Sequence, residues 1–483
     1  MSNTAPKMTN YRWSICTLLF FATTINYLDR QVLSLTWKDF IVPEFHWTDT
    51  QYGLITASFS IFYAISMLFA GRFIDWMDTK KGFMWAIFVW SIGACLHAYC
   101  GIATSGILAG EWFVGFERAR EVIGTLDNVA KVANVSVVLF IFARLVLAVG
   151  EAGNFPGAIK ATAEYFPKKD RAFSTSIFNA GATVGALAAP VLIPNLAKAW
   201  GWEAAFIVIG AMGFVWMGFW QFMYHKPHAN KHVNAAELEY IHQDPVDVST
   251  AADGVGSAQG KISFMRCLSY RQTWAFAVGK FMTDGVWWFF LFWTPAYLSS
   301  VYGIKSSDPA GQAAIFVLYA ITLLSIIGGW LPTFFVEKKG MNPYAGRMKA
   351  MLIFAFIPLL ALAAQPLGRY SFWLPVIIIG IAGAAHQAWS ANIFSTVGDM
   401  FPKKAIATIT GIGGMAGGIG SFLINISSGV LFDHAGNTQM VFMGFHGREA
   451  GYFIVFSLCG VAYLIGWTIM RALVPHYKPI TDL

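Results

Sequence analysis

Long apolar segments recur along the whole chain, and short polar stretches separate them. A helix needs roughly 20 mostly apolar residues to cross a bilayer. About twelve segments approach or exceed that length, near residues 13–35, 52–75, 83–103, 135–158, 172–194, 203–224, 274–299, 311–336, 350–366, 371–397, 406–432 and 450–473. A polar linker divides them six and six. We therefore predict an all-α membrane protein with about twelve transmembrane helices, arranged as one bundle over 1–224, a linker over 225–273 and a second bundle over 274–483.

The two halves repeat each other. The segment Gly71–Gly82, which ends in Thr-Lys-Lys-Gly, is matched by Gly329–Gly340, and Phe-Pro-Lys-Lys follows the fourth helix of each half. Two pseudo-symmetric six-helix bundles are the architecture that such a repeat predicts. The first half carries extra residues at 104–134, which we interpret as an expanded external loop containing a short amphipathic element. A substrate-binding lid is the alternative interpretation of this loop.

Composition narrows the class of protein. Hydrophobic residues make up 56% of the chain and charged residues only 12%, whereas a soluble domain carries about 25% charged residues. The net charge of +7 comes from Lys and Arg clusters in the loops of one side. This positive-inside pattern places both termini in the cytoplasm and argues against a nucleic-acid partner. The five cysteines are scattered and give no metal or disulfide pattern.

Three motifs carry a resemblance to a known family. They are Asn26-Tyr-Leu-Asp-Arg30, then Arg144-Leu-Val-Leu-Ala-Val-Gly-Glu151-Ala-Gly-Asn154-Phe-Pro156, and Gly383-Ala-Ala-His386-Gln387-Ala-Trp389-Ser390-Ala-Asn392. With the six-plus-six repeat, they resemble the major facilitator superfamily. Within it they look like the anion:cation symporter family, most closely its bacterial hexuronate transporters. The resemblance implies a monomeric, multi-pass protein of the bacterial inner membrane, without a cofactor, that imports glucuronate or galacturonate with protons by alternating access.

Ionisable residues inside the predicted helices are the candidate chemistry. A charge at mid-membrane costs on the order of 3 kcal/mol, so such a residue is paired, hydrated or used. The planar fork of Arg30 suits a substrate carboxylate; its alternative is a permanent ion pair with Asp29 or Glu151. Glu151 is the first candidate for the coupling proton and Asp29 the second, with structural ion pairs as their alternative. Arg144 lies two helical turns before Glu151 on the same face, about 10.5 Å along the axis, and completes a polar column.

Polar side chains elsewhere are candidates for the sugar ring and for gating. The further residues that we expect to bind substrate are Tyr63, Asn154, His386, Gln387, Ser390, Asn392 and Asn425. His386 could equally be a satisfied donor between helices, and an aromatic residue such as Tyr63 is more often a packing residue. The resemblance implies gating ion pairs at the cytoplasmic ends, which we assign to Asp75, Lys80 and Lys81.

Three other functions compete with hexuronate import. The first keeps proton symport and changes the substrate to an open-chain aldonate or aldarate. The second is an organic-phosphate antiporter, which would use one basic residue from each half and has no need of the acidic Asp29 and Glu151. The third, a membrane enzyme, lacks a nucleophile, base or metal constellation at depth in this sequence. Na⁺ remains an alternative coupling ion.

Overall fold

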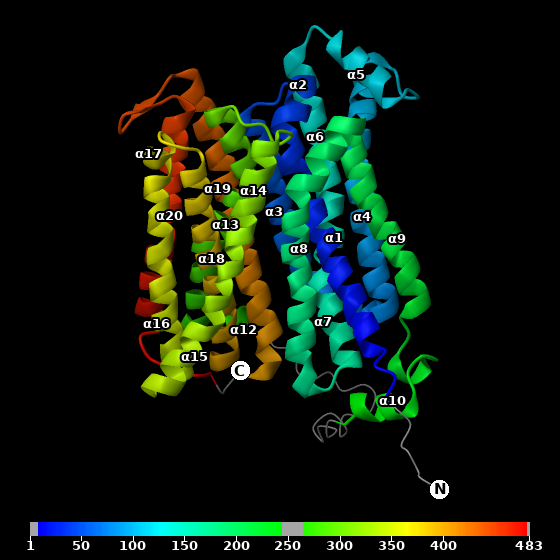
Figure 1. Cartoon of the computed structure of the whole chain (residues 1–483), viewed down its shortest axis with the longest axis vertical. Helices are drawn as coiled ribbons and strands as arrows, with labels where there is room; N and C mark the ends of the chain where they lie inside the picture. The colour runs from blue at the N-terminus through cyan, green and yellow to red at the C-terminus, as the bar shows by residue number, and fades with distance from the viewer. Residues whose placement is uncertain (1–7, 244–263, 481–483) are drawn as a thin grey trace.

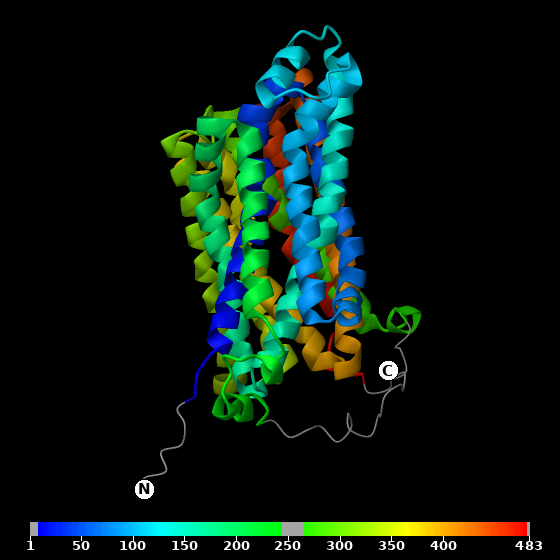
Figure 2. The same cartoon turned by 90° about the vertical axis from the view of Figure 1, so that its right-hand side faces the viewer.

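Long helices stand side by side in two bundles, one from each half of the sequence (Figures 1 and 2). The computed structural model describes residues 8–243 and 264–480. We call the end where α1 (Arg12–Thr36) begins and α20 (Arg448–Leu473) ends the linker end, because α10 (Ala235–Ile241) lies there. The opposite end, which carries α2 (Val42–Phe45) and α5 (Phe116–Gly124), is the distal end (Figure 1).

The first half contains six long helical spans and short elements at their ends. After α1 come a π-helical turn η1 (Trp37–Ile41), α2, α3 (Asp49–Met77), α4 (Thr79–Ala109), α5, α6 (Val129–Glu151), α7 (Asn154–Tyr165), α8 (Lys168–Trp200), α9 (Trp202–Met223) and the 3-10 turn η2 (Pro227–Ala229). The helices α6 and α7 together form the fourth span.

The second half repeats this plan with more interruptions. Its elements are α12 (Phe264–Cys267), α13 (Arg271–Tyr302), α14 (Pro309–Thr322), η3 (Leu323–Ile326), α15 (Ile327–Lys339), α16 (Pro343–Phe356), η4 (Ile357–Ala363), α17 (Ala364–Gly368), α18 (Trp373–Met400), α19 (Lys403–Asn437), the hairpin β1 (Val441–Phe442) and β2 (Phe445–His446), and α20. In the hairpin, Val441 pairs with His446 and Phe442 with Phe445.

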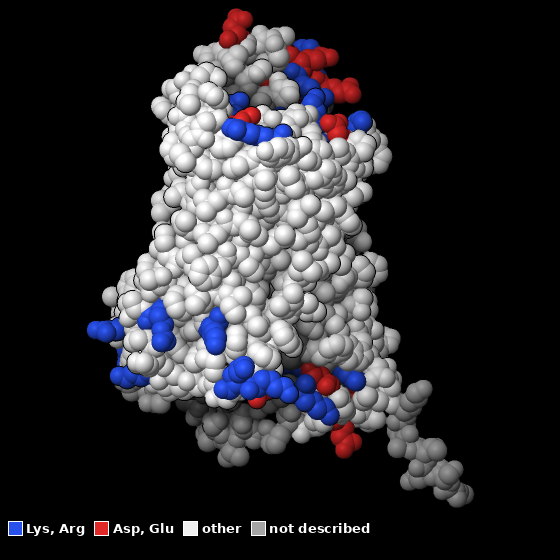
Figure 3. Space-filling model, turned by 60° about the vertical axis from the view of Figure 1, so that its left-hand side comes forward, with Lys and Arg blue, Asp and Glu red and all other residues white. Residues whose placement is uncertain are grey.

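Ten helical spans of the described chain are long and apolar enough to cross a bilayer. The two remaining long helices, α1 with 25 residues and α13 with 32, carry charges: Asp29, Arg30 and Lys280, which are buried, and Asp284, which is half-buried. These side chains lower the mean hydropathy of the helices without shortening them, so α1 and α13 complete the two sets of six. Figure 3 shows the consequence on one face, where Lys, Arg, Asp and Glu gather at both ends and leave a broad belt without charge. The predicted fold class is confirmed.

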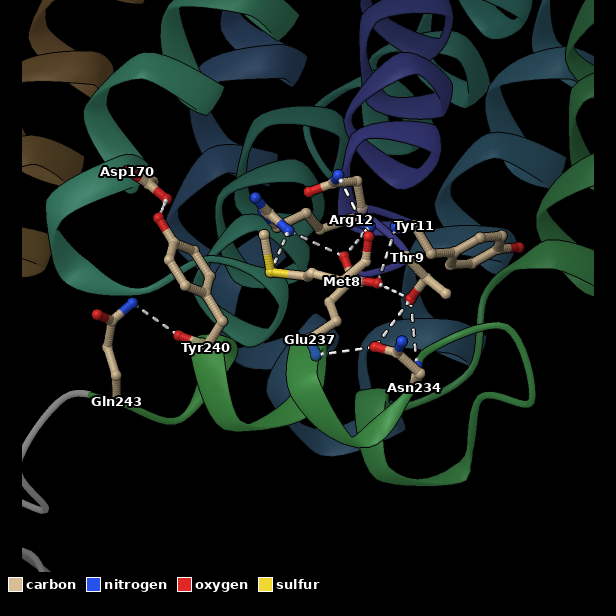
Figure 4. Close-up of polar contacts among 10 residues, drawn as sticks. Met8, Thr9, Tyr11, Arg12, Asp170, Asn234, Glu237, Tyr240 and Gln243 are labelled. Carbon is tan, nitrogen blue, oxygen red and sulfur yellow. Dashed lines mark hydrogen bonds and ion pairs between the residues drawn. The ribbon is translucent and has the colours of Figure 1, made fainter. Parts of the chain in front are cut away.

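Part of the predicted linker is attached to the first half. Helix α10 lies beneath α1, and the carboxylate of its Glu237 accepts hydrogen bonds from the backbone N–H groups of Tyr11 at 2.9 Å and Arg12 at 3.0 Å (Figure 4). Tyr240 donates to the Asp170 carboxylate of α8 at 2.7 Å. The rest of the predicted linker, 244–263, lies outside the described residues.

The expanded loop at 104–134 forms the predicted amphipathic element. Helix α5 buries Ala119, Val122 and Ile123 and exposes its charged face. Arg120 fastens it to the bundle through ion pairs with Glu203 of α9 at 2.8 Å and Glu44 of α2 at 3.3 Å. Its contacts lie within the first half, which favours the interpretation as an embellishment over that of a lid.

Candidate functional site

The fourth span breaks where the candidate proton carrier lies. Helix α6 ends at Glu151 and α7 begins at Asn154. Pro156 has no backbone N–H, so it cannot hydrogen-bond the carbonyl of Ala152 four residues earlier, and the helix is interrupted there. Discontinuous helices supply polar groups at the sites of many transporters. The break therefore puts Glu151 and Asn154 together inside the first bundle, where both are fully buried.

Arg30 of α1 and Glu151 form a buried ion pair. The guanidinium donates from Nε at 3.0 Å and from Nη2 at 2.8 Å to the same carboxylate oxygen, Oε2. The Arg30 side chain is 7% exposed and that of Glu151 is 0% exposed. The sequence analysis left a permanent ion pair of Arg30 with Asp29 or Glu151 as an alternative. In this structure Arg30 pairs with Glu151, and the pair joins α1 to α6.

Aromatic rings surround the Arg30 guanidinium. Its Cζ atom lies 4.9 Å from the ring centroid of Tyr63, 5.2 Å from that of Tyr27 and 5.9 Å from that of Phe59. A fourth ring, that of Trp288 on α13, approaches to 5.2 Å from the second half. A cation over an aromatic face is stabilised by the ring quadrupole, most of all where water is excluded. Arg30 consequently lies at a point where both halves meet, with Tyr63 and Trp288 on either side of the boundary.

Several buried polar groups of the first bundle have no partner among the described residues. Both carboxylate oxygens of Asp29, all three guanidinium nitrogens of Arg144 and the amide atoms of Asn26 and Asn154 are in this state, as is Oε1 of Glu151. Arg144 packs over the Phe59 ring at 5.2 Å. Unpaired buried charges are costly, so a native protein keeps them where water, protons or a polar ligand enter. Arg144 and Oε1 of Glu151 are thus the members of the predicted polar column that lack a partner among the described residues.

The second half contributes an ion pair of its own. Lys280 and Asp284, one turn apart on α13, approach to 2.7 Å, and Lys280 also lies 4.2 Å from the Phe394 ring centroid. His386 of α18 stacks on Trp287 at 5.4 Å and shares a 2.8 Å hydrogen bond with the Tyr463 hydroxyl of α20. This contact corresponds to the second of the two roles considered for His386, the satisfied donor between helices.

The remaining candidates of the second half fall into two groups. Asn392 donates to the backbone carbonyls of Gly328 and Ala388, both at 2.8 Å, and so joins α18 to the start of α15. Asn425 accepts from the Trp293 indole at 2.9 Å and donates to the Ser421 carbonyl at 2.8 Å. In this structure both amides hydrogen-bond to neighbouring helices and to their own helix, and their expected use for substrate hydroxyls stays a prediction. Gln387 and Ser390 are half-buried and free of hydrogen bonds within the described chain.

The residues expected to gate the linker end make contacts within the first half. Asp75 pairs with Lys160 of α7 at 2.9 Å, and Lys80 donates to the Gln221 carbonyl of α9 at 2.7 Å. Lys81 is exposed. In this structure the partners of Asp75 and Lys80 thus belong to the first half, whereas a gating contact would join the two halves.

Polar contacts between the halves gather instead at the distal end, on residues that the sequence analysis did not select. They involve Asp39 and Asp49 of the first half and Ser306, Asp433 and Arg448 of the second. A capping pattern at Thr48–Gln51 signals the start of α3, but nothing local to it identifies partners nearly 400 residues away. No group of three or more His, Cys, Asp or Glu side chains suited to a metal ion occurs in the described parts of the chain.

Comparison with known proteins matches this architecture and site to one family. The model of the Major Facilitator Superfamily matches residues 19–425. The hexuronate transporter of Escherichia coli (strain K12) is 28% identical over 466 residues, which are 96% of this chain and 95% of that protein. The galacturonate transporter of Dickeya chrysanthemi is 26% identical over 73% of this chain and 90% of its own length. The predicted resemblance to hexuronate transporters is confirmed by these relatives.

Solved structures agree on the fold. A D-xylose–proton symporter superposes with a TM-score of 0.70 at 14% identity, covering 98% of this chain and 100% of the other. A bacterial homologue of the human lysosomal transporter Spinster, in an inward-facing and occupied conformation, gives a TM-score of 0.65 at 19% identity, over 96% and 97% of the two chains. The relatives are membrane transporters rather than enzymes, and this chain belongs to the Major Facilitator Superfamily.

Proposed function

We propose that this protein imports hexuronates, such as glucuronate and galacturonate, in symport with protons by alternating access. The observation that carries the proposal is the buried Arg30–Glu151 ion pair, which lies at a break in the fourth span and within reach of both halves. Arg30 is then the ligand of the substrate carboxylate. The names of the hexuronate and galacturonate transporters among its relatives support the substrate class.

Competition for one guanidinium couples the proton to the substrate. In this structure Oε2 of Glu151 holds two Arg30 donors. Protonation of Glu151 removes the negative charge from that side chain and weakens its hold on Arg30. The Arg30 guanidinium is then free to donate to the carboxylate of the sugar acid, and its planar fork allows one hydrogen bond to each carboxylate oxygen. On the other side of the membrane, loss of the proton restores the Arg30–Glu151 pair and expels the anion, which returns the protein to its starting state.

Charge balance sets the driving force. A hexuronate carries one negative charge, and an inside-negative potential opposes its entry by about 2.3 kcal/mol per 100 mV. One proton on Glu151 makes the cycle electroneutral, so the pH gradient alone drives it. A second proton on Asp29, whose carboxylate oxygens have no partner within the described chain, would make the cycle electrogenic.

The sugar ring needs both apolar and polar contacts. Tyr63 and Trp288 flank Arg30 and offer flat surfaces for a ring. We assign the hydroxyl groups of the substrate to Gln387 and Ser390 in the second half and to Asn154 in the first, because the side chains of all three lack a partner among the described residues. His386, held by Trp287 and Tyr463, then positions this wall of α18.

Lys280 supports a second candidate function, the transport of aldarates. An aldarate carries a carboxylate at each end, and Lys280 is a buried cation of the second half that could receive the second one, as Arg30 receives the first. A probable galactarate/D-glucarate transporter of Escherichia coli (strain K12) is 23% identical over 91% of this chain and 92% of its own length. Galactarate therefore belongs in any test of substrate preference.

We further propose that the linker end faces the cytoplasm of a bacterium and that the protein works as a monomer in the inner membrane. Both termini are then cytoplasmic, in accordance with the Lys and Arg clusters of that end. Because the distal contacts join the two halves at that end, we expect the site to exchange with the cytoplasm when these contacts are in place.

Uptake into proteoliposomes tests the substrate and the ion. The purified protein is reconstituted, and the uptake of labelled galacturonate, glucuronate and galactarate is measured with an inward proton gradient, an inward Na⁺ gradient or neither. We expect accumulation of a hexuronate under the proton gradient and its collapse on addition of a protonophore. Accumulation of galactarate alone would favour the aldarate function, whereas a response to Na⁺ without a response to pH would overturn proton symport.

A further inference from the structure

The first turn of α3 at the distal end is capped by a carboxylate from the other half of the molecule. The four N-terminal N–H groups of a helix have no partner within the helix. Thr48 and Gln51 form a capping box, with the Gln51 N–H donating to the Thr48 hydroxyl at 3.2 Å. The N–H groups of Asp49 and Thr50 donate to the two carboxylate oxygens of Asp433 on α19, at 3.0 and 2.6 Å. Asp433 thus binds the positive end of the α3 dipole.

The side chain of Asp49 makes the reciprocal contact. Its Oδ2 accepts from Arg448, the first residue of α20, at 2.8 Å, and its Oδ1 accepts from Lys38 of η1 at 2.8 Å. The Asp49 side chain is only 4% exposed, so its carboxylate is largely shielded from water although the Arg448 side chain is 42% exposed. Loss of a partner from such a pair is costly because it leaves a poorly solvated charge.

A third carboxylate extends the contact. Asp39 of η1 accepts from the Ser306 N–H at 2.7 Å and hydroxyl at 2.9 Å, and from the Ser299 hydroxyl at 2.7 Å. The same Ser306 hydroxyl lies 2.7 Å from the backbone carbonyl oxygen of Leu35 at the end of α1, so its single proton is shared between this carbonyl and Asp39. The η1 turn that follows α1 and the start of α3 are therefore both tied to the second half through carboxylates.

Beneath these carboxylates the two halves touch through their backbones. A Cβ atom on Gly53 of α3 would lie 2.6 Å from the Asn425 carbonyl oxygen, and one on Gly429 of α19 would lie 2.4 Å from that of Asp49. Ser60 and Ser421 share a 2.8 Å hydrogen bond one to two turns further into the bundle. Because the backbones of α3 and α19 are this close, one helix cannot easily slide along the other beneath the polar contacts.

We propose that Asp39, Asp49 and Asp433 form a distal gate, and that Asp433 is its latch. In this gate the helix N-terminus of one half recognises a carboxylate of the other, and this contact must break before the site can open to the distal side. The proposal rests on the alternating access of the proposed function but not on the identity of the substrate. Opening the gate separates the Asp433 carboxylate from the N-terminus of α3. The capping box of Thr48 and Gln51 stays with α3, so the helix does not unwind.

A distance measurement between the halves tests the gate directly. Spin labels are placed at the exposed Lys131 of α6 and Asn437 of α19, after replacement of Cys95, the half-buried cysteine. Distances are measured by pulsed EPR on the full-length protein in lipid nanodiscs without substrate. For the unaltered gate we expect one predominantly short distance.

Asp433→Asn is expected to raise the ratio of long to short distances about tenfold, because it weakens a pair of charge-assisted hydrogen bonds. Arg448→Gln should shift the ratio in the same direction by breaking the Asp49 contact. The matched control is Asp308→Asn, the same change at an aspartate that accepts from the Lys305 N–H within its own half at 3.1 Å. If Asp433→Asn and Arg448→Gln both fold and give the same distance distribution as Asp308→Asn, the proposed gate is wrong. Failure of hexuronate transport would leave this result unaffected, because no substrate is present.

Discussion

At the scale of single residues, the guanidinium of Arg30 is shared between two carboxylates, that of Glu151 and that of the proposed substrate. Arg30→Lys keeps the charge and removes the planar fork that binds a carboxylate through two parallel hydrogen bonds. We expect hexuronate affinity to fall by about 10- to 100-fold, the loss of roughly 1.5–3 kcal/mol for a charged hydrogen bond. Equilibrium binding of labelled galacturonate measures it, with Arg369→Lys at the exposed distal surface as the control. Equal affinities for the two variants would contradict the role of Arg30.

A second prediction at the scale of single residues concerns the contact between the Trp288 ring and Arg30. It faces Arg30 at 5.2 Å from the opposite half, so it stabilises the cation only when the halves are together. Trp288→Leu should weaken substrate binding about 5- to 30-fold, because a desolvated cation–π contact contributes about 1–2 kcal/mol. Trp288→Phe should retain most of the affinity. The same binding measurement with Trp330→Leu, an exposed tryptophan of α15, controls for loss of a large side chain, and a Trp288→Leu affinity equal to this control would exclude the contact.

The residues of the first-half site could be found from the sequence, and their pairing could not. Asp29, Arg30, Arg144 and Glu151 stand out because a charge inside an apolar segment is expensive. Which carboxylate Arg30 takes depends on the packing of α1 against α6, which no local pattern records. The same limit applies to Asn392 and Asn425, whose residue type suits a hydroxyl ligand but whose amides are occupied by neighbouring helices.

At the scale of elements, α10 acts as an external cap for α1. The Glu237 side chain is 0% exposed and accepts from the Thr9 hydroxyl, the Tyr11 and Arg12 N–H groups and the Arg12 guanidinium (Figure 4). Glu237→Gln should lower the free energy of unfolding by about 1.5–3 kcal/mol, because it removes a buried charge that pairs with Arg12. The midpoint of thermal unfolding followed by tryptophan fluorescence reports it. Glu239→Gln, at an exposed position of the same helix, should leave the midpoint unchanged, and identical midpoints would argue against the cap.

Close approach of α3 and α19 gives a second prediction for the elements. Gly53→Leu places a side chain where a Cβ atom alone would meet the Asn425 carbonyl oxygen at 2.6 Å. Small residues permit such close helix contacts in membranes, so the larger side chain keeps the distal end from closing. We expect transport to fall by at least about tenfold while the protein stays folded. Initial uptake rates in proteoliposomes measure the loss. Gly71→Leu is the control because a Cβ there meets nothing within 4 Å; equal rates for the two variants would contradict the contact.

Most elements could be predicted from hydropathy alone, since the spanning helices other than the charge-bearing α1 and α13 are long apolar runs. The attachment of 225–243 to the first half could not, because the Glu237 and Tyr240 contacts join polar residues far apart in the sequence. The break between α6 and α7 follows from Pro156, whose effect on the Ala152 carbonyl is predictable once the segment is known to be helical.

At the scale of the whole molecule, two bundles meet at the distal end, and each carries an ion pair within its long helices, Arg30–Glu151 in the first and Lys280–Asp284 in the second. The internal repeat predicts two similar halves but not which of their ends is closed. The sequence analysis placed the gate at the linker end on Asp75, Lys80 and Lys81. The structure places the contacts between Asp49, Asp433 and Arg448 at the other end. The conformational state therefore had to come from the structure.

The central claim is that Glu151 couples a proton to a sugar-acid anion by competing with it for Arg30. Its most direct test compares the protein with Glu151→Gln, which is permanently uncharged, in proteoliposomes. Two rates are measured: accumulation driven by an inward proton gradient in vesicles without internal substrate, and exchange of labelled for unlabelled galacturonate in loaded vesicles without a gradient. The account predicts that the rate of gradient-driven accumulation falls at least about tenfold in Glu151→Gln, because this side chain cannot carry the proton. Exchange is retained, because Arg30 stays free for the anion. Accumulation of galacturonate by Glu151→Gln as strong as that of the unaltered protein would contradict it.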